Sequence, residues 1–435
     1  MAKVIIIGAG LTGISTAYHL EKNNFFDYSI VEKDTTIGGL CRSVYEDGFT
    51  FDYTGHLLHA SDQGFQKLIH DIVGIDTLNS IFRRSFIYSQ DTFTKYPYQI
   101  NLYGLPPKTI AECIEGFATR KKSKKRSQAF YDFVLENFGK GIAKNFFFPF
   151  QKKIFSYDLK KVTSTWMGRF VPSTSLEQMV KGALVDATLE NKVGYNAHFY
   201  YPKNGGIQSW IIKLAQQLKN PIQTDCGVTK INMAKKEVTF SNNQNESFDI
   251  IINTMPLDRL LNCLEEKTNN NLKQAAKKLV CNSVVNFNLG IARPDISDKH
   301  WIYFPESTYP FYRLGFPHNF AQSMAPEGFS SLYGEFSFIN KSPRYVNEKL
   351  HASLAATKKL FNLDQKEIVT QKIIPISHAY VIYDFWREKN LPKIHHHLEA
   401  QNIHSVGRYG EWKYSSMQEA VLDGKKIAEQ IITRL

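Results

Sequence analysis

The chain opens on a short apolar strand that runs into a glycine-rich turn, and this feature limits the fold more than any other. Residues 4–7 are aliphatic and β-branched, the turn at 8–13 reads GAGLTG, and a helix-like stretch follows from Ile14. A second apolar segment, residues 28–31, ends at Glu32. Strand, glycine turn, helix, strand and acid in this order predict a Rossmann-like βαβ unit that binds a dinucleotide.

Each part of this unit has a physical task. Gly8 permits the tight turn, Gly10 lets a pyrophosphate approach the backbone, and Gly13 lets the helix pack closely on the strand. The amino end of the helix adds unpaired N–H groups and the positive end of its dipole. Glu32 lies about twenty residues past the last glycine, where a carboxylate accepts hydrogen bonds from a ribose diol.

The length, net charge and cysteine content of the chain limit which folds, partners and locations we expect. With 435 residues the chain exceeds one ordinary core, so we expect two or three domains. The net charge of +12 favours an anionic partner, and no nucleic-acid-reading module is visible. Five scattered cysteines without a CxxC predict neither a disulfide framework nor a metal site. The first strand begins at once and no apolar run reaches about eighteen residues, so we expect a cytoplasmic protein without a transmembrane segment.

The residues after Glu32 indicate which dinucleotide binds. Gly38-Gly39-Leu40, followed by Arg42, resembles the extended FAD signature of the clan that contains amine oxidases, protoporphyrinogen oxidases and UDP-galactopyranose mutases. The resemblance implies FAD. We expect it to bind without a covalent link, because no cysteine or histidine is clearly placed for one, although His56 and Cys41 are near enough in sequence to keep a link open. NAD(P)H is a candidate reductant.

Further segments match the same clan in the same order. Thr54-Gly55-His56 stands where the mutases carry glycine-glycine-histidine, which implies that His56 lies beside the flavin ring. Val228 lies in a strand where the clan holds adenine through the backbone of a valine, and residues 407–417 match the turn and final helix that close over the flavin. The expected cofactor-binding residues are Gly8, Gly10, Leu11, Thr12, Gly13, Glu32, Lys33, Gly38, Gly39, Leu40, Arg42, Gly55, His56, Val228, Gly407, Arg408, Ser416 and Met417.

The resemblance covers nearly the whole chain and is greatest to the eukaryotic type of UDP-galactopyranose mutase. The string PFYR, which ends at Arg313, resembles the mutase segment whose arginine grips the substrate diphosphate, a task that suits the planar fork of arginine. The alternative is that Arg313 braces the sheet through an ion pair, for example with Glu335 on a neighbouring strand. We expect His56, Arg313 and Tyr380 to be catalytic. The expected substrate-binding residues are Arg169, Tyr312, Arg313, Tyr383 and Tyr414.

The resemblance also implies an architecture. We predict an α/β fold with a discontinuous Rossmann-like FAD-binding domain, a helical insertion and an antiparallel-sheet substrate domain. The expected bounds are 1–62, 199–258 and 402–435 for the FAD-binding domain, 104–195 for the insertion, and 63–103 and 275–398 for the substrate sheet.

Several substrate residues depart from the mutase pattern. Arg169 is one place off the family arginine, and Ser415-Ser416-Met417 shortens a loop that carries a phosphate-binding asparagine in the mutases. One hypothesis is a mutase-like isomerase that acts on a nucleotide-activated sugar or a similar anionic small molecule, with a reduced flavin as nucleophile. The others are an FAD-dependent oxidoreductase of the amine oxidase or protoporphyrinogen oxidase type and a non-enzymatic, flavin-stabilised scaffold. The sequence leaves open whether the protein forms an oligomer.

Two polar runs are predicted to lie at the surface. Residues 120–126 are lysine and arginine around one serine, which is typical of a solvated loop or a contact with a polyanion or membrane. Residues 395–397 are three adjacent histidines, which cannot all face one metal ion from a helix or strand.

Overall fold

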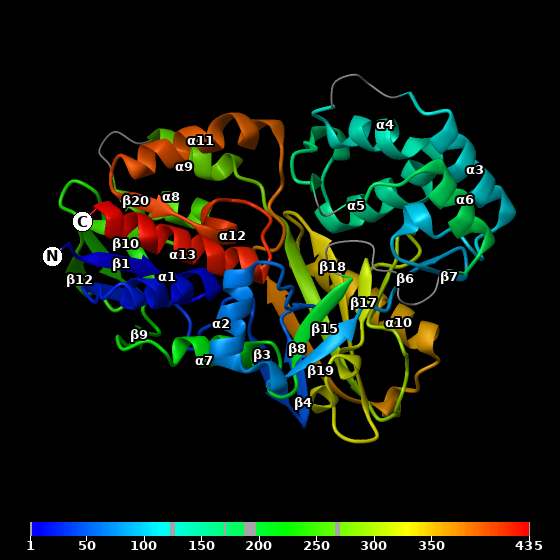
Figure 1. Ribbon diagram of the computed structural model, residues 1–435, viewed down its shortest axis with the longest axis horizontal. Coiled ribbons are helices and arrows are strands. Elements are labelled where there is room, and N and C mark those ends of the chain that lie inside the picture. The colour runs from blue at the N-terminus through cyan, green and yellow to red at the C-terminus, as the bar shows by residue number, and fades with distance from the viewer. Residues whose placement is uncertain (1, 122–126, 169–170, 187–196, 266–269, 435) are drawn as a thin grey trace.

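A computed structural model describes residues 2–121, 127–168, 171–186, 197–265 and 270–434 of the chain. Its elements form two large sheets, helices on the first sheet, and a helical layer beside the second (Figure 1). The expected fold class, an α/β protein with a Rossmann-like unit, is confirmed. Arg169 and most of the basic run at 120–126 lie outside the described residues.

The first sheet is parallel and has the strand order β20-β13-β1-β2-β9. Val4 and Ile6 pack into the core on one face, and Ile5 and Ile7 into the core on the other, as the strand period of two requires. Burial on both faces explains why the first strand is a continuous apolar run. The strands are β1 (Val4–Ile7), β2 (Tyr28–Val31), β9 (Ile222–Gln223), β13 (Ile250–Asn253) and β20 (Ile403–Ser405).

Helices cover both faces of this sheet, with the last helix, in red, beside the first, in blue (Figure 1). Gly424 permits that approach, because a Cβ there would lie 2.6 Å from the carbonyl oxygen of Thr12. On one face lie α1 (Leu11–Lys22), α2 (Gln63–Val73), α7 (Gln208–Ala215) and α13 (Met417–Arg434). On the other lie α8 (Leu257–Cys263), α9 (Asn270–Lys278) and α11 (Phe385–Glu399).

The second large sheet has the order β19-β15-β18-β17-β16-β6-β7. Its pairs are antiparallel except that β16 and β6 run parallel, so the sheet expected to be antiparallel is mixed. These two strands come from distant parts of the chain, and no hairpin forces them to pair antiparallel. The strands are β6 (Ser85–Ser89), β7 (Thr92–Lys95), β15 (Ser283–Ile291), β16 (Trp301–Tyr303), β17 (Arg313–Gly315), β18 (Ser330–Phe338) and β19 (Ile368–Ile376), and α10 (Pro343–Phe361) packs on one face.

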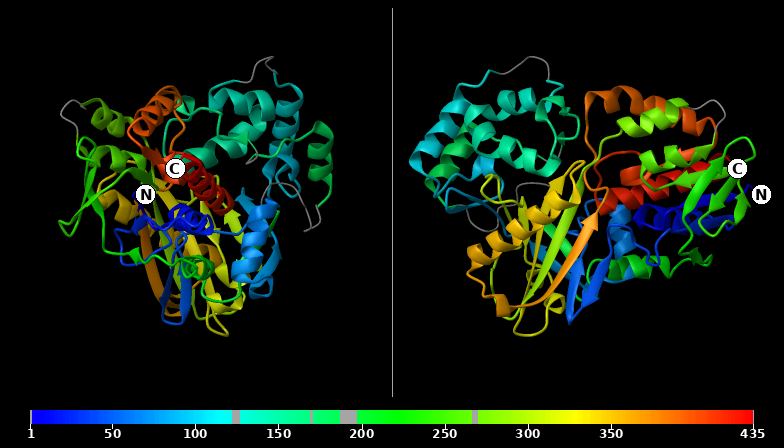
Figure 2. Two further views of the ribbon diagram at one scale, coloured as in Figure 1. Left: turned by 60° about the vertical axis from the view of Figure 1, so that its left-hand side comes forward. Right: turned by 180° about the vertical axis from the view of Figure 1, so that it is seen from behind.

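A helical layer stands beside the second sheet, as both views of Figure 2 show. The aromatic run that ends at Phe155 forms much of its core: Phe146, Phe147 and Phe150 are buried against one another. The helices are α3 (Pro107–Ala118), α4 (Phe130–Ile142), α5 (Phe148–Phe155) and α6 (Leu176–Leu184).

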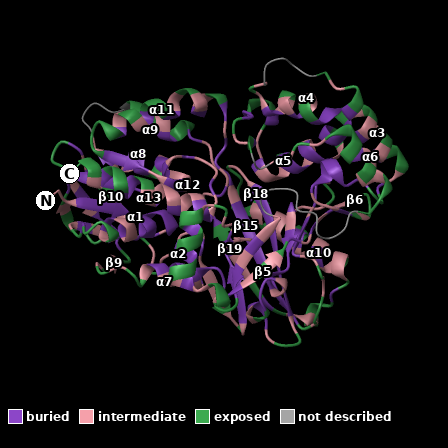
Figure 3. Ribbon diagram, in the orientation of Figure 1, coloured by how far each residue is buried: buried purple, intermediate pink, exposed green. Residues whose placement is uncertain are grey.

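Smaller sheets complete the fold. A hairpin forms at Asp47-Gly48, where both residues have the positive φ, 51° and 84°, that a tight two-residue turn needs. Figure 3 shows the strands largely as buried and the outward helix faces as exposed. The remaining strands are β3 (Ser43–Glu46), β4 (Phe49–Asp52), β5 (Leu78–Phe82), β8 (His198–Pro202), β10 (Val228–Asn232), β11 (Glu237–Phe240), β12 (Asn245–Ser247) and β14 (Leu264–Glu265).

Residues 379–384 form no strand: they make isolated bridges at Val381 and Asp384 and backbone hydrogen bonds to residues 280–282, and the side chains of Asn282 and Arg408 bind two more of their backbone groups. One local expectation needs correction. The three histidines lie within α11, where His396 is exposed but His395 and His397 are half-buried. The described residues hold no cluster of three metal-ligand side chains. None of the described helices combines the length and the apolarity needed to cross a bilayer.

Candidate active site and cofactor cavity

A cavity of about 960 Å³ lies where the carboxyl ends of β1, β2 and β13 face the second sheet. Ligands bind at this edge of open α/β sheets. All the expected cofactor residues line the cavity except Gly13 and Gly407, and so do Tyr312, Arg313, Tyr380 and Tyr414. We call the part lined by residues 8–12, 31–42 and 226–228 the nucleotide half, and the part lined by residues 53–59, 301–333, 380 and 408–414 the substrate half.

Two glycine turns meet in the nucleotide half. Gly8 has a φ of +98°, and a Cβ on Gly13 would lie 1.9 Å from the Gly8 carbonyl oxygen, so this helix–strand contact requires glycine. Gly10 bridges to Gly38, and a Cβ on Gly39 would lie 3.4 Å from the Gly10 Cα. Helix α1 begins beside them without a side-chain cap, so its amino end can receive a phosphate.

Glu32 closes the same half at the end of β2. Its carboxylate accepts hydrogen bonds from the backbone N–H groups of Ala9 at 3.0 Å and Asp34 at 3.1 Å, and the residue is 8% exposed. These bonds fix the carboxylate against the glycine turn while leaving acceptor positions that face the cavity. The arrangement suits an adenosine ribose.

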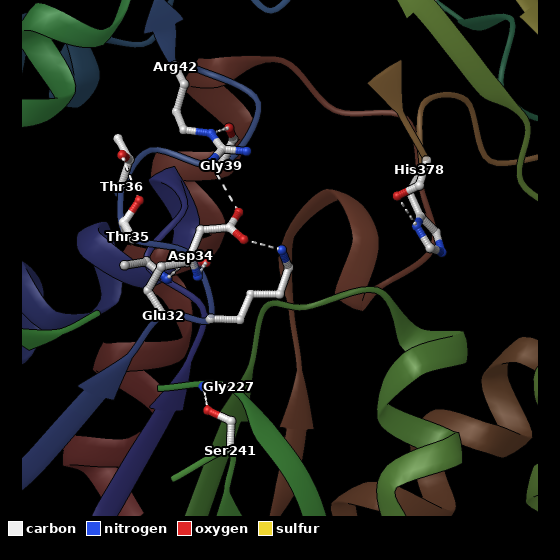
Figure 4. A network of polar contacts seen from close by, with 12 residues as sticks. Glu32, Asp34, Thr35, Thr36, Gly39, Arg42, Gly227, Ser241 and His378 are labelled. Atoms are coloured by element: carbon white, nitrogen blue, oxygen red, sulfur yellow. Dashed lines mark hydrogen bonds and ion pairs between the residues drawn. The ribbon is translucent and has the colours of Figure 1, made fainter. Parts of the chain in front are cut away.

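A network that sequence reasoning missed surrounds Asp34 (Figure 4). Arg42 donates to Asp34 at 3.0 Å and to the Gly39 carbonyl at 2.8 Å, and the Lys33 ammonium lies 2.5 Å from the other Asp34 oxygen. Burial raises the pKa of Asp34, but Lys33 and Arg42 outweigh burial and lower that pKa overall. Arg42 is therefore held at the second glycine turn, where a pyrophosphate would need a cation.

The start of β10 and the glycine before it form one wall of the nucleotide half. Gly227 donates its N–H to the Ser241 hydroxyl at 3.1 Å and accepts from the Ser241 N–H at 2.7 Å (Figure 4). Val228 follows it and lines the cavity. The two glycine turns, the uncapped helix, Glu32 and Val228 together fit an adenine dinucleotide.

His56 lines the substrate half of the cavity. Burial, together with the positive charges of Arg408 and Arg313, lowers the pKa of His56 to about 3. The imidazole is therefore neutral at physiological pH, and it can serve as a hydrogen-bond donor or acceptor but not as a standing cation.

The cavity face of the second sheet carries a buried ion pair. Arg313 on β17 stands directly across from Glu335 on β18 and binds it in a fork, with Nη2 2.7 Å from Oε1 and Nε 3.2 Å from Oε2. The side chains are 16% and 0% exposed. The structure thus contains the ion pair of the alternative interpretation of Arg313, and the same guanidinium also faces the cavity.

Arg408 is a second cation in the substrate half. It donates to the carbonyls of Ser415 at 2.9 Å and Ala379 at 3.0 Å, and its Nε is buried without a hydrogen-bond partner. The described residues offer it no carboxylate within salt-bridge distance. Gly407 does not line the cavity but packs on α1, where a Cβ would lie 2.5 Å from the Thr12 hydroxyl oxygen.

Tyrosines wall the substrate half. The rings of Tyr380 and Tyr414 are nearly parallel, with centroids 6.4 Å apart, and Arg408 lies 4.8 Å from the Tyr414 ring centre. Tyr312 is 2% exposed and lies beside them. Tyr383 is not part of the lining; its hydroxyl accepts the Tyr414 N–H at 2.7 Å, so it supports the wall from behind.

The amino end of α13 reaches the cavity at Ser416 and Met417. Ser416 donates its N–H to the Glu419 carboxylate at 2.7 Å, and Glu419 donates its N–H to the Ser416 hydroxyl at 3.3 Å. This reciprocal cap satisfies part of the helix end, and the rest is available to a ligand.

Sequence reasoning missed Trp301, Tyr303 and Tyr333 as lining residues. A signal was present, because Trp301 and Tyr303 are two residues apart on one strand, as are Tyr333 and Glu335 on another, and such pairs share a face. The sequence alone does not show which face of each strand lines the cavity, because this depends on how the strands pair.

A family model for flavin-containing amine oxidoreductases matches residues 11–432. The chain belongs to this family. It is 20% identical over 404 residues to coproporphyrinogen III oxidase of Bacillus subtilis (strain 168), with 84% of each chain covered. It is 25% identical over 337 residues to 4,4'-diapolycopene oxygenase of a Methylomonas species, covering 69% of this chain and 65% of that one.

Solved structures give the same assignment. Reduced UDP-galactopyranose mutase superposes with a TM-score of 0.91 at 25% identity and covers 100% of this chain and 96% of its own. A putative protoporphyrinogen oxidase from Exiguobacterium sp. 255-15 gives 0.77 at 15% identity, with 100% and 99% covered, and shows the shared fold. The protein is an FAD-dependent flavoenzyme, and the clan assignment made from the sequence is confirmed.

Proposed function

We propose that this flavoenzyme acts on a nucleotide-activated sugar or a similar anionic small molecule and isomerises it in the manner of UDP-galactopyranose mutase. The observation that carries the proposal is the superposition on reduced UDP-galactopyranose mutase over the whole chain, with a TM-score of 0.91. The polar, cationic lining of the substrate half supports it as well, since arginines and tyrosines suit phosphates and hydroxyls better than an apolar chain.

The nucleotide half would hold FAD. Gly8, Gly10 and the amino end of α1 would receive the pyrophosphate, Glu32 would accept the ribose hydroxyls, and Val228 would meet the adenine. A bound flavin supplies an electron-rich ring when reduced and a hydride acceptor when oxidised.

The substrate half would bind and shield the reactant. Two donors of Arg313 are engaged by Glu335, but its Nη1 has no hydrogen-bond partner among the described residues and can donate to a phosphate oxygen. Arg408 adds a positive charge that no described carboxylate neutralises. Tyr380 and Tyr414 would exclude water from the reacting centre.

The second candidate is an FAD-dependent oxidoreductase of the amine oxidase or protoporphyrinogen oxidase type. The ion pair favours it, because Glu335 neutralises the cation expected to grip a diphosphate. This candidate needs an aromatic cavity but no diphosphate grip, and the tyrosine wall meets that need.

One experiment separates the candidates. The purified protein should be yellow and should release FAD on denaturation. With the flavin reduced, UDP- or dTDP-sugars should be isomerised with no net change in flavin redox state. Anaerobic bleaching of the oxidised flavin band by an amine or a porphyrinogen, without binding of any nucleotide diphosphate at millimolar concentration, would establish the oxidoreductase instead.

Arg313 variants test the grip itself. Arg313→Ala should weaken UDP binding by roughly 2–5 kcal/mol without lowering the FAD content, and Arg313→Lys should also bind weakly because lysine lacks the fork. If both variants melt at a lower temperature but bind UDP as the wild type does, Arg313 only stabilises the sheet through its ion pair with Glu335.

A further inference from the structure

Thr54, two residues before His56, has a backbone conformation that β-branched residues rarely adopt. Its φ is +98°, whereas the other non-glycine residues with positive φ in the described ranges lie between 47° and 62°, and none of them is β-branched. Threonine is strained at this φ, which glycine adopts freely. Strain of this kind beside a candidate active site points to a compensating role.

Contacts on both sides hold the strained loop in place. The Thr54 N–H donates to the Asp52 carbonyl at 2.9 Å, and the His56 N–H donates to the Thr54 carbonyl at 3.0 Å. Gly55 lies against Tyr333, since a Cβ on Gly55 would be 2.3 Å from the Tyr333 hydroxyl oxygen. The surroundings therefore impose the conformation, whichever side chain stands at position 54.

The side chain of Thr54 is directed to His56. Its hydroxyl oxygen lies 3.3 Å from Nδ1 of the imidazole, and both residues line the cavity. The structure gives this hydroxyl no other hydrogen-bond partner among the residues it describes. Nδ1 is thus the one acceptor that the described residues offer to the Thr54 hydroxyl proton, although the distance alone does not say which of the two atoms carries the hydrogen.

We infer that Thr54 is a positioning residue whose hydroxyl donates to Nδ1 of His56 and holds the imidazole as the tautomer protonated at Nε2. The inference rests on the proposed function only for the placement of His56 beside the flavin. The ring nitrogen that remains then offers a fixed N–H donor to the cofactor or substrate. This explains why a strained threonine stands where glycine would fit.

Nitrogen-15 NMR of the histidine rings tests the tautomer in the flavin-free and the FAD-loaded protein. The chain has 13 histidines, and His56→Gln identifies the resonances of His56 by their loss. The wild type and Thr54→Ser should show the pattern protonated at Nε2, while Thr54→Val and Thr54→Gly should show shifts averaged between the two tautomers. A wild type protonated at Nδ1, or a Thr54→Val variant with the wild-type pattern, would overturn the inference.

Thermal melting separates strain from hydrogen bonding. Thr54→Gly should melt at a higher temperature than Thr54→Val, because glycine relieves the strain and valine keeps it. The matched control is Thr50→Gly in strand β4, which should lower the melting temperature. A lower melting temperature for Thr54→Gly than for Thr54→Val would contradict the strain at this site.

Measuring kcat adds a test, because kcat would not change if Thr54 had a structural role alone. Loss of one neutral hydrogen bond should lower kcat by roughly 2- to 10-fold in Thr54→Val, and Thr54→Ser should restore it. If no nucleotide sugar is turned over, the proposed function fails while the NMR result still decides the tautomer. If Thr54→Val turns over a sugar as the wild type does, the hydroxyl does not position a reacting group.

Discussion

The two halves of the cavity are built in different ways. The nucleotide half consists mainly of backbone: two glycine turns, an uncapped helix end and one carboxylate fixed by N–H groups. The substrate half consists of side chains that pair across strands, such as Arg313 with Glu335, or donate to distant carbonyls, as Arg408 does. A backbone site depends on the local order of residues, whereas a side-chain site depends on which strands become neighbours.

Breaking the buried ion pair should have the largest effect and would test how far the substrate half depends on cross-strand pairing. Glu335→Ala leaves Arg313 unpaired beside the cavity, so the free energy of unfolding should fall by about 3–5 kcal/mol. Chemical denaturation measures this. The control is Glu348→Ala, which breaks the ion pair with Arg344 on the surface of α10, where the side chains are 62% and 89% exposed, and its effect should be far smaller. Equal losses would show that burial does not distinguish the two pairs.

Replacing Glu32, the acid of the nucleotide half, should lower the affinity for FAD. Glu32→Ala loses one or two charge-assisted hydrogen bonds to the ribose, each worth roughly 1.5–3 kcal/mol, so FAD affinity should fall on the order of tenfold or more. Fluorescence titration of the flavin-free protein measures it. Glu32→Gln keeps one carbonyl acceptor and should lose less, and unchanged affinity in both variants would assign the ribose to another acid.

Substitutions at two glycines of the same turn should have different effects, one on stability and the other on FAD affinity. Gly13→Ala places a Cβ 1.9 Å from the Gly8 carbonyl oxygen and should destabilise the flavin-free protein by about 1–3 kcal/mol. At Gly10 the nearest atom to a Cβ is 3.9 Å away, so Gly10→Ala should melt like the wild type yet bind FAD at least about tenfold more weakly, because the methyl occupies the path of the pyrophosphate. Loss of stability in both variants would mean that Gly10 serves packing instead.

The same contrast explains what the sequence could reveal. The Rossmann-like unit, the hairpin at Asp47-Gly48 and the cofactor residues depend on glycines and short spacings, and the structure brings nearly all of these residues to one cavity. Tyr303 and Tyr333 escaped notice because only the register of their strands with β17 shows which faces line the cavity. The partner of Arg313 was one of two alternatives, since the register that sets Glu335 opposite it is a property of the folded sheet.

The most gradual effect, spread over about two pH units, concerns a pair of carboxylates. Asp34, in the nucleotide half, has a lowered pKa, whereas burial raises the pKa of Asp52, just behind the substrate half, to about 6 despite hydrogen bonds from Ser43, Tyr201 and Ile207. Because the folded pKa of Asp52 is raised, its contribution to stability is complete below its ordinary pKa of about 3.9 and is lost as the pH rises through about 6.

Stability should therefore fall between about pH 4 and pH 6 by at most about 1.4 kcal/mol per pH unit, which is the limit for one proton. Denaturation of the wild type and Asp52→Asn across this window measures the share that belongs to Asp52, because the other acids titrate in both. Asp34→Asn is the matched control, and its contribution runs the other way: the stability from a carboxylate with a lowered pKa is lost as the pH falls. Identical slopes for the wild type and Asp52→Asn would mean that folding does not raise the pKa of Asp52, and the contrast between the carboxylates of the two halves would then be lost.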